Sequence, residues 1–161
     1  MLTTDLEYGA CDATWLRACA ESGARYRRVE IPLPFRPGQV LERLMSAVTA
    51  RTRLIYLSHI TSTTALTLPV AELCAAARRL GIPTLVDGAH APGQIALDIE
   101  AIGADLYVGN CHKWLCAPKG SAFLHARPDR QDWLHATVTS WGYAAHAGGH
   151  AVPAGDARRA D

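Results

Sequence analysis

The sequence predicts an α/β fold in which helices flank a mostly parallel sheet. Short apolar runs alternate along the chain with segments whose apolar residues recur at helical spacing. Glycine and proline separate several of these segments, as expected at the ends of helices and strands. Polar residues follow directly after three of the apolar runs, which is where parallel α/β sheets bind their ligands. The 161 residues suffice for one domain with a hydrophobic core.

The first helix and strand are predicted from their end signals. Asp12 can cap a helix that passes through Trp15 and stops at Gly23. Residues Tyr26 to Ile31 then form a predicted strand, which ends at Pro32 and Pro34 because proline cannot continue a central ladder. A single helix followed by a strand already fits the predicted α/β alternation.

Two further helices enclose a short, fully apolar strand. The first follows Pro37-Gly38 and has its apolar residues on one face. Residues Leu54 to Leu57 form a continuous apolar run, which is typical of a strand buried on both sides. Pro69 opens the next helix, which extends to Leu80 and ends at Gly81.

Three more strands are predicted, and polar stretches follow the strand ends. The strands are Thr84–Val86, Leu106–Val108 and Ala122–Leu124. Carboxyl ends of parallel strands meet at one edge of a sheet, so the polar stretches should converge there. They are Ser58-His59, Asp87-Gly88-Ala89-His90 and Gly109-Asn110-Cys111-His112-Lys113.

Composition excludes several classes of function. The chain has 16 Lys and Arg against 15 Asp and Glu, a net charge of +1, which gives no support for nucleic-acid binding. No apolar run approaches the roughly 18–20 residues of a membrane-spanning helix. Residues 1–5 lack the basic and apolar regions of a signal peptide. We therefore expect a cytoplasmic protein.

The five cysteines do not form a disulfide or zinc pattern. Their number is odd and they are scattered, unlike the cysteines of a secreted disulfide scaffold. Cys111, His112 and Cys116 invite an alternative interpretation as a metal-binding module, but their spacing fits no zinc pattern. We expect no metal site, and stoichiometric metal in the purified protein would support that alternative.

Lys113 and Asp87 are the candidates for chemistry at the predicted sheet edge. A lysine in a partly desolvated pocket can form a Schiff base with a carbonyl group. Asp87 directly follows a buried run, three residues before His90. Taken alone, Asp87 could cap a loop, and each histidine could be structural. Together, a strand-end carboxylate, a nearby histidine and a His112-Lys113 pair suit pyridoxal phosphate, which needs an amine and a carboxylate partner for its ring nitrogen.

Two stretches carry a resemblance to a known family. Residues 85–93 and 109–120 resemble the class V aminotransferase family of fold-type I pyridoxal-phosphate enzymes, and the second is most similar to its isopenicillin N epimerase-like subgroup. Three shorter stretches support the resemblance, which covers residues 1–143: Thr3–Ala10, Ser58–Ser62 and Ser140–Tyr143.

The resemblance implies a role for each candidate residue and a pyridoxal 5'-phosphate cofactor. Lys113 would be the Schiff-base lysine and Asp87 the partner of the ring nitrogen. The other cofactor-binding residues would be His90 and Ser62 near the ring oxygen, His112 and Asn110 at the phosphate, and Tyr8 over the ring. The implied reaction occurs at the α-carbon of an amino-acid-type substrate, and the implied assembly of the full-length form is a homodimer.

Family members are considerably longer, so the resemblance also implies an incomplete enzyme. We expect residues 1–143 to be part of a large pyridoxal-phosphate-binding domain and residues 144–161, which lack periodicity, to be a disordered tail. The expected function is that of an epimerase-like enzyme in truncated form, itself inactive. The alternatives are a catalytically inactive fragment, or a C–S lyase or desulfurase-like activity in the full-length form.

Overall fold

The computed structural model describes residues 1–138. The chain divides into two units, residues 1–131 and residues 132–161, and residues 132–138 of the second unit are exposed. The Ser140–Tyr143 motif and the predicted tail 144–161 lie outside the described residues. Within the described part, none of the helices has the length and apolar character needed to cross a membrane.

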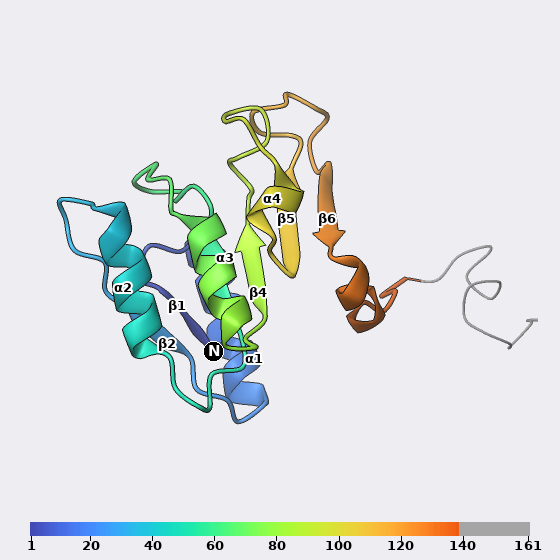
Figure 1. The fold of residues 1–161 in the computed structure, drawn as a ribbon. Coiled ribbons are helices and arrows are strands. Elements are labelled where there is room, and N and C mark those ends of the chain that lie inside the picture. The colour runs from blue at the N-terminus through green and yellow to red at the C-terminus, as the bar shows by residue number, and fades with distance from the viewer. Residues whose placement is uncertain (139–161) are drawn as a thin grey trace, which may run out of the picture. The chain divides into compact units, whose positions relative to one another are not determined.

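The first unit is built on one six-stranded sheet with the order β2-β1-β3-β4-β5-β6 (Figure 1). All neighbouring pairs are parallel except β5 and β6, which are antiparallel. The predicted α/β class with a mostly parallel sheet is therefore confirmed. The strands are β1 (Leu2–Thr4), β2 (Arg27–Val29), β3 (Ile55–Ser58), β4 (Thr84–Asp87), β5 (Leu106–Asn110) and β6 (Ala122–Ala126).

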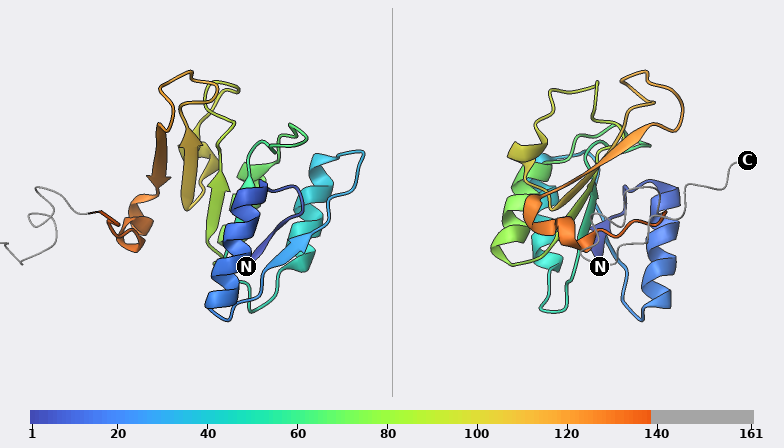
Figure 2. Two further views of the ribbon diagram at one scale, coloured as in Figure 1. Left: turned by 180° about the vertical axis from the view of Figure 1, so that it is seen from behind. Right: turned by 90° about the vertical axis from the view of Figure 1, so that its right-hand side faces the viewer.

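Helices cover the two faces of this sheet unequally. The three helices that follow β2, β3 and β4 lie on one face, and α1 lies on the other (Figures 1 and 2). After β2 the chain crosses β1 to form β3, so the direction of strand addition reverses between β1 and β3. Such a reversal is where open α/β sheets bind ligands. The helices are α1 (Gly9–Glu21), α2 (Pro37–Ala47), α3 (Val70–Arg79), α4 (Ile99–Ile102) and the 3-10 helix η1 (Pro128–Trp133).

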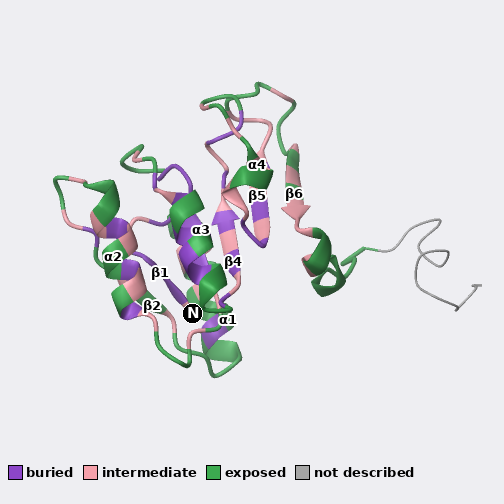
Figure 3. Ribbon diagram, viewed as in Figure 1, coloured by how far each residue is buried: buried purple, intermediate pink, exposed green. Residues whose placement is uncertain are grey.

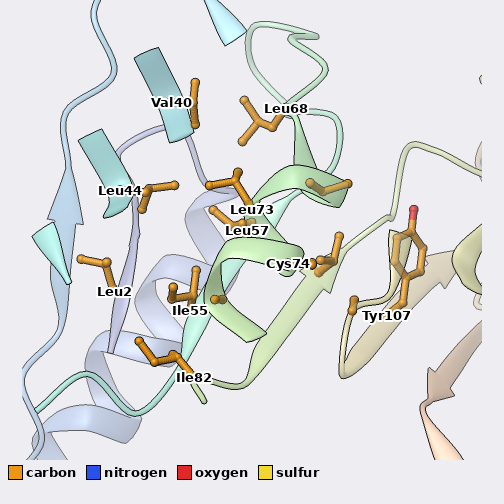
Figure 4. Packing of buried hydrophobic residues seen from close by; sticks show 14 of the residues in the cluster. Leu2, Val40, Leu44, Ile55, Leu57, Leu68, Leu73, Cys74, Ile82 and Tyr107 are labelled. Atoms are coloured by element: carbon orange, nitrogen blue, oxygen red, sulfur yellow. The ribbon is translucent and has the colours of Figure 1, made fainter. Parts of the chain in front are cut away.

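The core lies between the sheet and helices α2 and α3 (Figures 3 and 4). All four residues of β3 are buried, as predicted for a strand covered on both faces. Helices α2 and α3 each turn a buried apolar stripe to the sheet. The stripes are Val40, Leu44 and Ala47 on α2, and Val70, Leu73, Cys74, Ala76 and Ala77 on α3.

Several details differ from the sequence-based expectations. Strand β1 was missed, because three residues with one aliphatic side chain carry no detectable period. Helix α1 begins at Gly9 rather than at an Asp12 cap. Asp12 lies within its first turn and instead pairs with Arg28 at 2.6 Å and accepts a hydrogen bond from Tyr26 at 2.7 Å. These contacts tie α1 to the segment around β2.

Candidate active site at the carboxyl edge of the sheet

Alternate side chains of the central strands point either into the core or into a cavity of about 360 Å³. Leu57, Val86 and Tyr107 are buried in the core. Side chains an odd number of positions away in each strand point to the opposite face, where α1 lies. Six of them line the cavity together with residues of α1: Tyr56, Ser58, Leu85, Asp87, Val108 and Asn110. Three neighbouring strands thus contribute to one site.

Asp87 is the carboxylate of this cavity. It is the last residue of β4, and Ser58 lies beside it in the register of the sheet. Its Oδ1 accepts a hydrogen bond from the Ala89 amide at 2.9 Å, and its Oδ2 accepts one from the Tyr56 hydroxyl at 2.9 Å. The side chain is therefore held in place from two sides.

Tyr56 and Cys11 are site residues that the sequence analysis did not identify. The Cys11 thiol of α1 donates to Asp87 Oδ2 across 3.7 Å, and the Trp15 ring packs on Tyr56 with 5.6 Å between ring centroids. Burial and then the charge of Asp87 raise the pKa of Tyr56, so the phenol keeps its proton and donates it. Burial is also the main reason that the pKa of Cys11 is raised. These contacts depend on how β3, β4 and α1 are placed in the fold, so no local sequence signal identifies them.

Lys113 lies in the loop that joins β5 to β6. Backbone hydrogen bonds hold this loop: Cys111 N donates to Ser121 O at 3.0 Å, and Ala117 N donates to Cys111 O at 3.1 Å. Lys113 is half-buried and lines the cavity, whereas the chain's other lysine, Lys119, is exposed. The structure thus brings Lys113 and Asp87 to the same cavity.

His90 contacts Lys113 from the neighbouring loop. Its Nε2 lies 3.2 Å from Lys113 Nζ. The two loops approach closely at Gly93, where a Cβ atom would lie 2.7 Å from the backbone oxygen of Trp114. Gly93 also has a φ of 81°, a conformation that favours glycine. Gly93 therefore permits the contact between the His90 loop and the Lys113 loop.

Of the four remaining candidate residues, three line the cavity and one does not. Tyr8, Ser62 and Asn110 line the cavity, from the start of α1, the loop after β3 and the end of β5. His112 is not among the residues that line it, and its Nδ1 lies 3.0 Å from the Ser121 carbonyl oxygen. The predicted contact of His112 with a phosphate stays a prediction.

Glu7 forms a buried support beneath the cavity. Its carboxylate accepts hydrogen bonds from the Ser58 amide at 2.8 Å, the Ser58 hydroxyl at 2.6 Å and the Thr4 hydroxyl at 2.6 Å. Burial raises the pKa of Glu7 above its ordinary value, against the opposing effect of these hydrogen bonds. Glu7 joins the ends of β1 and β3 and so fixes Ser58 beside Asp87.

The donor set of the cavity fits pyridoxal phosphate. An ionised carboxylate offers about four lone-pair positions. The Ala89 amide, the Tyr56 hydroxyl and the Cys11 thiol account for three at Asp87, which leaves an acceptor position for a protonated ring nitrogen. Lys113 supplies the primary amine that a carbonyl-bearing cofactor needs. Ser62 and Asn110 add hydrogen-bonding groups in the same cavity.

A parallel sheet with a lysine, a histidine and a carboxylate at its carboxyl edge defines an α/β domain built to bind a small molecule at the strand ends. Residues 1–145 match the family described as aminotransferase class-V. The chain belongs to the class V aminotransferase family, and the predicted resemblance is confirmed.

Two curated relatives are isopenicillin N epimerases. The chain is 45% identical over 144 residues to that of Streptomyces clavuligerus and 42% identical over 145 residues to that of Amycolatopsis lactamdurans. Each match covers 89% of this chain and 36% of the relative. The chain therefore spans little more than a third of the length of these relatives.

Solved structures of the cystine C–S lyase C-DES share the fold. Its complex with the product cysteine persulfide has a TM-score of 0.80 and 30% sequence identity, covering 87% of this chain and 38% of the lyase. A lysine-to-alanine variant of C-DES, with glycine covalently linked to its PLP cofactor, has a TM-score of 0.79 and covers 37% of that chain. Family and fold neighbours together support the prediction of pyridoxal phosphate as the cofactor.

Proposed function

We propose that this chain forms the lysine and carboxylate side of a pyridoxal-phosphate-dependent active site that acts at the α-carbon of an amino-acid-type substrate. The observation that carries the proposal is the arrangement of Asp87 and Lys113 around one cavity, with His90 Nε2 3.2 Å from Lys113 Nζ. When bound, pyridoxal phosphate supplies an electron-withdrawing ring that eases removal of a proton from the carbon beside an amine.

Each residue has a proposed task toward this cofactor. Lys113 Nζ would hold it covalently, and Asp87 would keep its ring nitrogen protonated by charge. His90 and Ser62 would bind near the ring oxygen. Asn110 and His112 would bind the phosphate, and Tyr8 would lie over the ring.

Lys113 would also act on the substrate. A substrate amine that takes the place of Lys113 frees its Nζ, which can then take the α-proton as a general base. Return of a proton from water on the opposite face would give an epimer, as the isopenicillin N epimerase relatives suggest.

A C–S lyase reaction is the second candidate, and the fold similarity to C-DES favours it. Removal of the α-proton by Lys113 is common to both reactions. They differ in the next bond: a lyase substrate loses its sulfur substituent from the β-carbon, whereas an epimerase substrate regains a proton at the α-carbon. The same residues therefore serve both candidates.

The proposal includes a homodimeric enzyme in a reducing cytoplasm. All five cysteines are free, as expected for a protein kept in reducing conditions. Large apolar side chains exposed within the described part include Leu16, Trp114 and Leu115, which a second subunit could cover.

Covalent capture of the cofactor tests the proposed site. The purified 161-residue chain is incubated with pyridoxal phosphate, reduced with borohydride and mapped by mass spectrometry. We expect the label on Lys113, its loss in Lys113→Ala and its retention in the matched control Lys119→Ala. Label confined to Lys119, or none on a folded chain, would contradict the proposal.

Substrate processing is tested separately. The loaded protein is mixed with L- and D-amino acids and with cystine in deuterated water, and NMR follows deuterium at the α-carbon. Inversion without loss of sulfur supports the epimerase, and release of sulfur with a keto acid supports the lyase. In a form completed to the length of its relatives, neither reaction above that of free cofactor would contradict both.

A further inference from the structure

Two consecutive residues contact the two nitrogens of the His90 ring. Trp114 Nε1 lies 3.2 Å from His90 Nδ1, and Lys113 Nζ lies 3.2 Å from His90 Nε2. The His90 and Trp114 rings are 6.4 Å apart between centroids, at an interplanar angle of 55°. The Lys113 loop therefore holds the imidazole at both ends.

The chemistry of the indole sets the direction of these hydrogen bonds. An indole N–H can only donate, so His90 Nδ1 must accept. A neutral imidazole that accepts at Nδ1 carries its proton on Nε2. An imidazolium, or the other neutral tautomer, would place an N–H of His90 against the N–H of Trp114. Burial also lowers the pKa of His90, which favours the neutral ring.

We infer that Trp114 is a positioning residue that fixes His90 in the tautomer with its proton on Nε2, from which His90 donates to Lys113 Nζ. An amine accepts a hydrogen bond only through its lone pair, and that lone pair is what attacks a carbonyl group. In this arrangement the Lys113 amine accepts from His90 Nε2 through that lone pair. Its meaning for catalysis rests on the proposed function, whereas the tautomer itself does not.

Trp114 decides between two hydrogen-bond patterns. Without its N–H, the His90 proton could sit on Nδ1, and Nε2 would accept from a protonated Lys113. In that pattern Lys113 is the donor, and an ammonium donor has no lone pair with which to attack a carbonyl group. The other titratable groups around this cavity are Asp87 from β4, Tyr56 from β3, Cys11 from α1 and Tyr8 at the start of α1.

NMR of the cofactor-free chain tests the tautomer directly. Protein labelled with ¹⁵N in histidine gives imidazole nitrogen–proton correlations that distinguish the two tautomers, and His90→Gln assigns the signal. We expect His90 to carry its proton on Nε2. In Trp114→Phe the ring remains but the N–H is lost, so the preference should fall about fivefold, the value of one ordinary hydrogen bond. The pKa of His90 should rise, because its neutral form loses a donor.

A matched control separates this effect from loss of any indole. Trp133→Phe makes the same substitution in the 3-10 helix η1, and it should leave the His90 signals unchanged. Circular dichroism and thermal melts of all variants check folding. If Trp114→Phe does not fold, the wild-type spectrum still decides, because a proton on Nδ1 of His90 overturns the inference.

Amine reactivity gives a second readout. Reductive methylation of the cofactor-free chain at one fixed pH is quantified at both lysines by mass spectrometry. In Trp114→Phe the ratio of Lys113 to Lys119 modification should fall about fivefold. An unchanged ratio together with an unchanged tautomer would overturn the inference. Failure of Lys113 to capture pyridoxal phosphate, with the Nε2 tautomer intact, would instead contradict only the proposed function.

Discussion

The Tyr56 hydroxyl lies 2.9 Å from Oδ2 of Asp87 and bridges two neighbouring parallel strands at the floor of the cavity. Removal of this hydroxyl in Tyr56→Phe should lower the free energy of unfolding by about 1 kcal/mol. Because the lost hydrogen bond is to Asp87, the double variant Tyr56→Phe/Asp87→Asn should lose less unfolding free energy than the two single variants lose in sum. Urea denaturation of the four proteins measures this coupling. Strict additivity would mean that the hydroxyl does not act on the carboxylate.

Asp87→Asn should retain covalent capture of pyridoxal phosphate by Lys113 but weaken its binding. The amide has no charge to balance a protonated ring nitrogen, and a hydrogen bond to a charged group is worth about 1.5 kcal/mol or more, which is about tenfold in affinity. Titration followed by visible absorbance measures the change. Asp98→Asn is the control, since Asp98 caps α4 through Ala101 N and asparagine caps equally well. Equal affinities of the two variants would leave Asp87 with a structural role alone.

Glu7→Gln should destabilise the protein most at acid pH. Burial raises the pKa of Glu7 in the folded state above its pKa in the unfolded state. The stabilisation that Glu7 contributes is therefore fully present when the pH is below the unfolded-state pKa, and it declines as the pH rises through the folded-state pKa. The substituted amide does not titrate, and its NH₂ group mismatches the donors of Ser58 and Thr4. The difference in unfolding free energy between wild type and variant should therefore shrink from pH 4 to pH 7. Chemical denaturation across this range checks the slope, and a difference that grows with pH would refute it.

Gly88→Ala should be strongly destabilising. A Cβ atom at Gly88 would lie 2.1 Å from the buried ring of Tyr107, which also forms a 2.8 Å hydrogen bond with His59. Overpacking of this kind costs about 1–3 kcal/mol. The control is Gly38→Ala, where nothing lies within 4 Å and alanine favours the helix. Thermal melts should place Gly88→Ala below wild type and Gly38→Ala at or above it, and the reverse order would contradict the packing argument.

Most helices and strands, and the location of the candidate site residues, could be predicted from the sequence because both leave local signals. Strand β4 begins at Thr84, as its apolar run predicted, and helix α2 begins at Pro37, slightly before the predicted start after Gly38. The same rule of strand ends selected Asp87 and Lys113, which the structure places around one cavity.

The contacts around Asp87 and His90 could not be predicted in this way. Tyr56 was noted only as part of an apolar run, and its hydroxyl acts on a residue 31 positions away. Cys11 is 76 positions from Asp87, and Trp114 acts on a histidine 24 positions earlier. Such pairs depend on sheet register and on how two loops pack, for which a single sequence carries no periodic signal.

The two halves of the site differ in the sequence separation between the segments that form them. The Lys113 loop closes an antiparallel hairpin of β5 and β6, whose five register pairs join residues close in sequence. The Asp87 environment draws on α1, β3 and β4, and so exists only after the crossovers between the parallel strands are complete. Since contacts between distant segments form late in folding, the lysine loop should acquire its shape before the carboxylate finds its donors. A complete chain that refolds would then present its nucleophile before the partner that balances the cofactor's charge.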